Sequence, residues 1–349
     1  MKKFDNDKIK KILVFQTAFL GDTVLSTPLF KNIKKHFNNA EITALVIPSN
    51  EPIISGNPYV DKIITYDKKS AKKLRGFLST RKLIKKERFD LVFSLHRSLR
   101  TALLLYLSGI PIRVGFCDSA FSVLYNLRIK RDLTQHDVKR NLSILTGGGM
   151  KEADLTDELL VTYSQKDKES VLSKMGDALP KNRPIIVVNP GSVWATKRYP
   201  YESFAKVISL LNELDKYRIV LTGGKDDIET AEKIMNLCGG KITNLTGKTS
   251  LKELSALLDS SALMITNDSG PLHIAASYNT PIVAIFGATT RELGFFPYNK
   301  NSVAIEKSLP CRPCGKHGGN KCPIGTFDCM RLIRPEEIYQ SALKMLTKE

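Results

Sequence analysis

Residues 262–287 read ALMITNDSGPLHIAASYNTPIVAIFG, and this stretch decides the fold. The apolar run 262–267 predicts a buried strand, and a turn of small and polar residues follows it. Pro271 is typical of a first helical turn, so we predict a helix over 271–278 and a second strand over 281–287. A strand, a helix and another strand in succession indicate parallel strands joined by a crossover helix.

The same alternation runs outward through most of the chain. In the first half we predict strands over 11–16, 41–47, 60–66 and 89–95 and helices over about 23–37 and 70–87. In the second half we predict strands over 185–190 and 217–224 and helices over 201–215, 226–238 and 251–259. The polar stretch around 165–182 is predicted to be a linker.

Two domains are expected, because 349 residues exceed the size of a single hydrophobic core. We predict an α/β fold with two Rossmann-like, doubly wound domains, over 1–170 and 180–335, and a C-terminal helix over 336–349. Such domains bind ligands at the carboxyl ends of their strands, so the two are expected to face a central cleft.

The chain is expected to be cytoplasmic. Its first ten residues, MKKFDNDKIK, are polar, which does not fit a signal peptide. No apolar stretch approaches the roughly 18 to 20 residues that a membrane span needs. Its six cysteines should therefore be reduced.

The positive charge is unevenly distributed. The net charge is +18, and residues 1–150 alone hold 27 Lys and Arg against 12 Asp and Glu. Nucleic acid, a membrane surface and a phosphorylated or acidic substrate are the partners that such a charge favours. Residues 68–88 hold ten Lys and Arg with apolar residues on one helical face. This pattern suits either an anionic membrane or a helix packed on its own domain.

Three strand-end turns carry the polar residues of a candidate site. The first is Phe19-Leu20-Gly21-Asp22, where the glycine permits a ligand to approach closely and the aspartate could equally cap a helix. The second, residues 189–200 (NPGSVWATKRYP), combines hydroxyls and cations in a way that suits a phosphate group, or forms an ordinary polar loop. The third is 266–275, where His273 would lie one turn into a helix, as a ligand or as a structural histidine.

Four cysteines lie close together near the C-terminus. Cys311, Cys314, Cys322 and Cys329 have the spacing C-x2-C-x7-C-x6-C. This spacing favours a structural zinc or, less readily, iron; disulfides and unliganded thiols are the alternatives.

Residues 11–28, 189–200 and 266–287 resemble the three signatures of glycosyltransferase family 9, the heptosyltransferases. Further segments at His96-Arg97, at Arg113 to Phe116 and from His136 also resemble that family. The likeness covers about residues 10–340. It implies a GT-B fold and an inverting glycosyl transfer that requires no metal or other cofactor.

The resemblance also implies partners and residue roles. The donor would be an ADP-sugar, typically ADP-heptose, and the acceptor would be the Kdo or heptose of a lipid A-linked core oligosaccharide. Asp22 would be the general base, and Lys197 would contact the donor diphosphate. The acceptor would meet His96, Arg97 and Arg113. The remaining donor-side positions would be Gly21, Ser192, Thr196, Thr249, Asp268, Ser269, Gly270 and His273.

The resemblance gives the basic first domain a role. It would bind the acceptor at the anionic inner face of the cytoplasmic membrane, to which the protein would attach peripherally, and no nucleic acid is expected. The alternatives are a family-9 transferase of another nucleotide sugar, a sugar-nucleotide epimerase with a similar two-domain design, and a nucleic-acid-binding protein that uses the basic helix.

Overall fold

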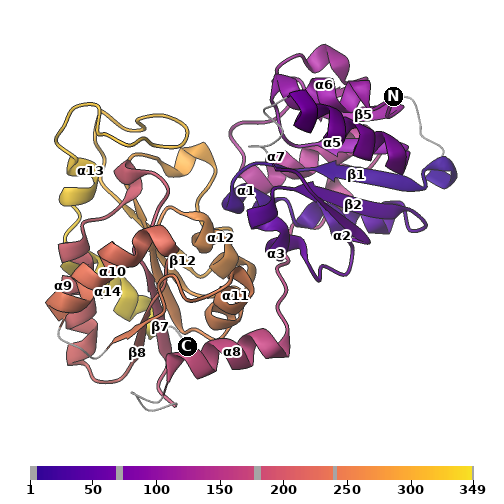
Figure 1. Cartoon of the computed structure of the whole chain (residues 1–349). Coiled ribbons are helices and arrows are strands. Elements are labelled where there is room, and N and C mark those ends of the chain that lie inside the picture. The colour runs from indigo at the N-terminus through magenta and orange to yellow at the C-terminus, as the bar shows by residue number, and fades with distance from the viewer. Residues whose placement is uncertain (1–5, 68–73, 177–181, 239–241, 348–349) are drawn as a thin grey trace. The chain divides into compact units, whose positions relative to one another are not determined.

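The computed structural model describes residues 6–67, 74–176, 182–238 and 242–347 and divides the chain into two compact units, Met1–Thr162 and Tyr163–Glu349 (Figure 1). Each unit contains one six-stranded parallel sheet with helices packed against it. The described part of the chain contains no helix that is both long and apolar enough to cross a membrane.

The sheet of unit 1 has the strand order β3-β2-β1-β4-β5-β6. Its strands are β1 Lys11–Phe15, β2 Glu41–Val46, β3 Lys62–Thr65, β4 Leu91–Ser94, β5 Ile112–Phe116 and β6 Leu127–Ile129. Its helices are α1 Leu20–Leu25, α2 Pro28–His36, α3 Glu51–Ile54, α5 Leu74–Glu87, α6 Leu99–Leu107 and α7 Asp137–Leu142.

The sheet of unit 2 repeats this topology, with the order β12-β11-β10-β7-β8-β9. Its strands are β7 Ile185–Asn189, β8 Arg218–Leu221, β9 Ile242–Asn244, β10 Leu263–Asn267, β11 Ile282–Phe286 and β12 Ser302–Glu306. Its helices are α8 Gln165–Met175, α9 Tyr201–Glu213, α10 Ile228–Cys238, α11 Leu251–Asp259, α12 Gly270–Ser277, α13 Asp328–Arg331 and α14 Pro335–Leu346.

The central strands are mainly apolar and buried because both faces of each sheet are covered there. Phe15 and Phe93 on the neighbouring strands β1 and β4 are fully buried in unit 1, and Phe286 is fully buried in unit 2. The C-terminal helix α14 belongs to this second core, since it contributes Ile338 and Ala342 to the buried cluster.

Two local predictions differ from the structure. The helix expected over 23–37 is two helices, because Pro28 begins α2 and the hydroxyls of Ser26 and Thr27 donate to backbone carbonyls of the preceding turn. The stretch expected to be a linker contains α8, whose first turn is capped by Ser164 and whose Lys174 donates to Glu253 on α11. Residues 177–181 of that stretch, and 70–73 of the helix expected over 70–87, lie outside the described residues.

The shared strand order determines where ligands can bind. In an open parallel sheet, the crevice lies where the connections reverse direction, at the carboxyl ends of the two central strands. In unit 1 these strands are β1 and β4, and in unit 2 they are β7 and β10. The three strand-end turns singled out in the sequence follow β1, β7 and β10.

Candidate active site

Asp22 is the carboxyl group at the crevice of unit 1. It is the third residue of α1, directly after β1, and its Oδ2 accepts a hydrogen bond from the Phe19 backbone N–H at 3.1 Å. The residue therefore caps the helix from inside its first turn, while Phe19 occupies the N-cap position. Gly21 beside it is buried. Capping and a chemical role remain compatible, because only one carboxylate oxygen is used for capping.

Asp22 also binds a proton unusually strongly for a carboxyl group. Burial, followed by the negative charge of Asp137, raises its pKa, while the Phe19 N–H and the positive charge of Arg97 oppose the shift, and the resulting pKa is about 7. Asp137 begins α7, which packs against α1. A carboxyl group with a pKa near neutrality can accept a proton from a substrate and release it again.

Further arginines and carboxylates lie near Asp22 and Asp137 at the carboxyl edge of the sheet. Arg97, after β4, donates to Asp118 at 2.7 Å, and Arg131, after β6, forms an ion pair with the same carboxylate at 3.1 Å. Arg140 on α7 lies 4.0 Å from Asp137. Burial raises the pKa of Asp137, while Arg131 and Arg140 oppose that shift. The carboxyl edge of unit 1 is therefore a dense set of paired charges.

The predicted acceptor residues lie at two opposite edges of the sheet of unit 1. His96 follows β4 beside Arg97, and its Nδ1 lies 2.9 Å from the Thr101 hydroxyl. Arg113 is the second residue of β5 and lies at the opposite, amino edge of the sheet. Its guanidinium donates to the backbone carbonyls of Leu124 and Ile110. The structure therefore places Arg113 apart from His96 and Arg97, where it holds the backbone at the far end of the strand.

A lysine, an aspartate and a threonine converge at the crevice of unit 2. Lys197 Nζ donates to Asp268 Oδ2 at 2.6 Å, and the Thr289 hydroxyl donates to the same oxygen at 2.6 Å. The three residues follow β7, β10 and β11 respectively. The Lys197 and Asp268 side chains are only 12% and 6% exposed, so the pair is largely shielded from water. Thr289 was not predicted, although it too is a hydroxyl in a turn directly after a strand.

The loop after β7 is held in place by close packing and by one asparagine. Asn267 donates to the Pro190 carbonyl at 2.7 Å and accepts from the Tyr199 N–H at 3.1 Å, so it fixes both ends of the loop. A Cβ atom at Gly191 would lie 2.3 Å from Asp227 Oδ2, so any larger residue there would require the Asp227 side chain to move. Lys197 thus lies in a loop that is anchored at both ends.

The other predicted donor-side residues lie at the same edge of the sheet. Ser269 is the N-cap residue of α12, Gly270 is its first residue, and His273 is buried in it. Ser192 and Thr196 are buried in the loop after β7. Thr249 is half-buried and directly precedes Ser250, the N-cap residue of α11. All of them therefore follow the carboxyl end of a strand.

The metal site expected from the four cysteines is not supported. The thiols of Cys311, Cys314, Cys322 and Cys329 are free and close enough to influence one another electrostatically. Among the residues that the structure describes, no group of three or more His, Cys, Asp or Glu side chains is placed to hold a metal ion.

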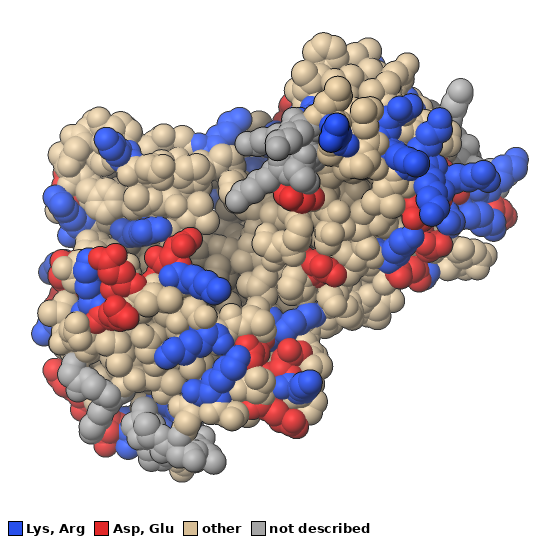
Figure 2. Space-filling view, viewed as in Figure 1, with Lys and Arg blue, Asp and Glu red and all other residues tan. Residues whose placement is uncertain are grey.

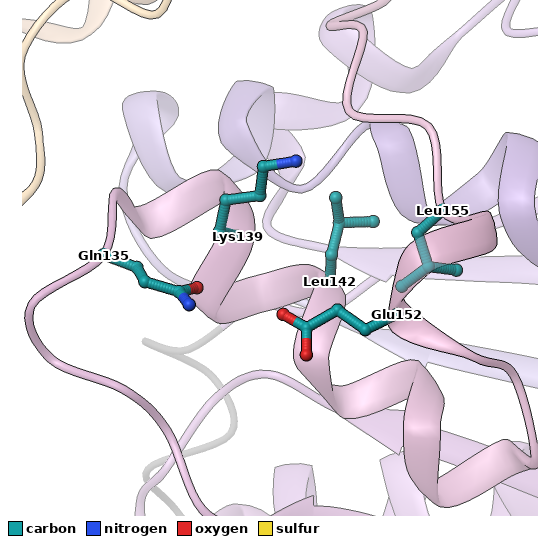
Figure 3. A pocket seen from close by; sticks show the side chains of 5 residues that line it. All are labelled: Gln135, Lys139, Leu142, Glu152 and Leu155. Atoms are coloured by element: carbon teal, nitrogen blue, oxygen red, sulfur yellow. The ribbon is translucent and has the colours of Figure 1, made fainter.

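A small pocket in unit 1 lies apart from these residues. It has a volume of about 170 Å³ and is lined by Gln135, Lys139 and Leu142 on one side and by Glu152 and Leu155 on the other (Figure 3). Ligand sites for small molecules typically have at least about 300 Å³, so this pocket is too small for a nucleotide sugar.

Comparison with known proteins identifies the family. The sequence matches glycosyltransferase family 9 (heptosyltransferase) over residues 77–322. The chain belongs to glycosyltransferase family 9.

Individual relatives agree with this assignment. The chain is 32% identical over 300 residues to lipopolysaccharide heptosyltransferase 3 of Escherichia coli K12, which covers 81% of this chain and 84% of the relative. The crystal structure of a family 9 glycosyl transferase from Veillonella parvula superposes with a TM-score of 0.86 at 25% identity, over 97% of this chain and 98% of that one.

A second solved structure, E. coli ADP-heptose lps heptosyltransferase II, has the same fold, with a TM-score of 0.77 at 24% identity over 96% of this chain and 98% of that one. The two parallel sheets are thus the two Rossmann-like domains of the GT-B fold, and the protein is a glycosyltransferase of the heptosyltransferase family.

Proposed function

We propose that the protein transfers heptose from ADP-heptose to the Kdo or heptose inner core of lipopolysaccharide, with inversion and without a catalytic metal. The observation that carries this proposal is the carboxyl group of Asp22 at the crevice of unit 1, because its pKa of about 7 suits a general base. Family membership supports the sugar, and the names of the E. coli relatives support the donor nucleotide and the lipopolysaccharide acceptor.

On the donor side, unit 2 has to bind and stabilise the leaving diphosphate. Lys197 supplies a positive charge at the carboxyl edge of the sheet, and Asp268 holds its ammonium group in position. The backbone N–H groups in the first turn of α12 have no partners within the helix, and they favour anions. Fixed donors of this kind stabilise negative charge that grows on the departing ADP as the glycosidic bond breaks.

On the acceptor side, Asp22 takes the proton of the attacking hydroxyl. The hydroxyl oxygen forms the new bond to the anomeric carbon on the face opposite the diphosphate, which inverts the configuration as ADP leaves. General base catalysis by a positioned side chain contributes about 10²–10⁴-fold to such a step. Asp137 assists because its negative charge strengthens the proton affinity of Asp22.

The acceptor's own negative charges have counterparts in unit 1. Arg97 and Arg131 share a single carboxylate, that of Asp118, so their guanidinium groups retain N–H donors for a sugar carboxylate. The side chain of Arg97 is 37% exposed and can be reached from solvent. We assign acceptor binding to Arg97, with His96 beside it, and add Arg131 in place of Arg113.

A second basic surface of unit 1 suits an anionic membrane. Figure 2 shows Lys and Arg side chains gathered on unit 1 near the start of β1. Exposed cations here include Lys10 before β1, Lys35 at the end of α2, and Lys85, Lys86 and Arg88 around the end of α5. We propose that this amino-edge surface attaches the protein to the inner face of the cytoplasmic membrane. Each Lys or Arg near an anionic bilayer contributes about 1 kcal/mol.

Liposome sedimentation tests the membrane proposal. Binding should require anionic lipid, should weaken as salt rises, and should fall when Lys85 and Lys86 are both replaced by Glu. The matched control is Lys206→Glu, an exposed lysine on α9 of unit 2, which should bind as the wild type does. Equal binding to neutral vesicles would contradict the proposal.

Calorimetric titration with ADP, UDP, GDP and CMP in parallel tests the donor. Selective binding of ADP, weakened by Lys197→Ala, is the expected result. The chain's single tryptophan, Trp194, lies in the same loop as Lys197 and provides an independent fluorescence signal for binding. Preference for another nucleotide would be consistent with a glycosyltransferase that uses a different nucleotide sugar as its donor. Binding of none of the four nucleotides would contradict the proposed donor site.

A further inference from the structure

The four-cysteine segment is attached to the donor-side loops of unit 2, although the described residues form no metal site there. The segment runs from the end of β12 at Glu306 to Cys329, the second residue of α13. Two sets of hydrogen bonds attach it, one through Arg312 and one through Gly319. The Arg312 contacts lead to Asp268, which binds the Lys197 ammonium group. The Gly319 contacts lead to Thr196, which directly precedes Lys197 in the sequence.

The first attachment is a buried arginine between the first two cysteines. The side chain of Arg312 is only 4% exposed and pairs with Glu306 at 2.7 Å. Its guanidinium also donates to the backbone carbonyls of Gly287, Thr289 and Lys307. Arginine suits this position because its five N–H donors lie in one rigid plane and can serve several acceptors together.

From Arg312 the contacts lead directly to the lysine. Arg312 donates to the Thr289 carbonyl at 2.7 Å, and the Thr289 hydroxyl donates to Asp268 Oδ2 at 2.6 Å. That same carboxylate oxygen accepts from Lys197 Nζ at 2.6 Å. The position of the lysine ammonium therefore depends on a carboxylate that Thr289 orients, and the Thr289 backbone is held by Arg312.

The second attachment holds the residue before the lysine. The Thr196 N–H and hydroxyl both donate to the Gly319 carbonyl, at 3.0 and 2.9 Å, and the Gly319 N–H donates back to the Thr196 hydroxyl at 2.8 Å. Thr196 is buried. The cysteine segment thus supports Lys197 from both sides, through its backbone neighbour and through its carboxylate partner.

We propose that Arg312 and Thr289 are positioning residues for transfer, and that they fix Lys197 by orienting Asp268. This inference rests on the proposed role of Lys197 at the donor diphosphate. A donor that is already in place stabilises a transition state more than a mobile one, which has to be ordered during the reaction. Loss of the positioning contacts should therefore reduce kcat more than it weakens nucleotide binding.

Two substitutions of Thr289 separate positioning from packing. Thr289→Val removes the hydroxyl while keeping the shape, and we expect kcat to fall about 10- to 100-fold, as for the loss of a hydrogen bond to a charged group. Thr289→Ser restores the hydroxyl and should recover most of the activity. KM for the donor and the calorimetric affinity for ADP should change less than kcat in both variants.

Arg312→Lys tests the contact between the Arg312 guanidinium and the Thr289 carbonyl. This variant keeps the positive charge and loses the planar set of donors, so kcat should fall. In the double variant with Thr289→Val, the decrease should be close to that of the stronger single variant, because both changes act on the same contact. Fully multiplicative effects on kcat would contradict the proposed route through Thr289.

A matched buried arginine provides the control. Arg218, at the start of β8, is also buried, and it donates to the backbone carbonyls of Met175 and Gly176 at the amino edge of the same sheet. Arg218→Lys should lower the melting temperature and leave kcat unchanged.

Wild-type kcat in folded Thr289→Val and Arg312→Lys would overturn the inference. If wild-type protein binds no ADP, the proposed donor site fails instead, and the same kcat comparison is then made with whichever nucleotide sugar is turned over.

Discussion

The two units have one strand order and opposite electrostatics at equivalent positions. At the crevice of unit 1, burial and then the negative charge of Asp137 raise the pKa of Asp22 to about 7. At the crevice of unit 2, Asp268 accepts hydrogen bonds from a lysine and a threonine. The first arrangement suits a group that accepts a proton, and the second suits a cation that has to stay charged and in place. The comparison shows that the fold provides the location, while the loops provide the chemistry.

The largest expected effect comes from removing the carboxylate of unit 1. Asp22→Asn should reduce transfer by at least about 10²-fold, because an amide cannot take the hydroxyl proton in the proposed step. Affinity for ADP should stay close to wild type, since the nucleotide is assigned to unit 2. Steady-state turnover and calorimetry on the same preparation check both statements, and near-normal turnover would leave Asp22 as a helix cap alone.

The next effect comes from removing the cation of unit 2. Lys197→Ala should lower kcat by about 10²–10³-fold, as the loss of a fixed charge-stabilising donor does in other enzymes. In contrast to Asp22→Asn, it should also weaken ADP binding and lower the melting temperature, because it leaves the Asp268 carboxylate buried without its cation. Unchanged ADP affinity would remove Lys197 from the diphosphate site.

A smaller effect tests the electrostatic cause of the difference between the units. Because Asp22 must be ionised to act as a base, kcat/KM should fall as the pH drops through about 7. The negative charge of Asp137 raises that pKa, so Asp137→Asn should lower it and shift the acidic limb of the profile to lower pH. Asp118→Asn, which alters the partner of Arg97 and Arg131, is the comparison variant. An unshifted limb in Asp137→Asn would show that Asp137 does not contribute to the raised pKa of Asp22.

The smallest expected effect concerns stability. A carboxyl group with a raised pKa stabilises the fold most below its unfolded pKa of about 3.9 and loses that contribution as the pH rises through its folded pKa. Asp22→Asn lacks this dependence, so its melting temperature relative to wild type should increase between about pH 4 and about pH 7. Thermal melts across that range measure it, and a constant difference would argue against a raised pKa.

The sequence alone determined the architecture and the three turns that carry the chemistry. Apolar runs, strand-end glycines and Pro271 are local signals, and each depends only on residues close together in the chain. They located Asp22, Lys197 and Asp268 correctly after the ends of strands, because strands and turns can be predicted without knowledge of the tertiary contacts.

Only the tertiary structure decided which charges meet. In the structure Asp137 lies near enough to Asp22 to raise its pKa, and Arg113 lies at the amino edge of its sheet. The Thr289 hydroxyl donates to Asp268, and Arg312 donates to the Thr289 carbonyl. These relations join loops that are far apart in the chain, and they depend on the strand order and on how deeply each side chain is buried. Local patterns carry no information about either quantity, and both determine proton affinity and the position of a catalytic cation.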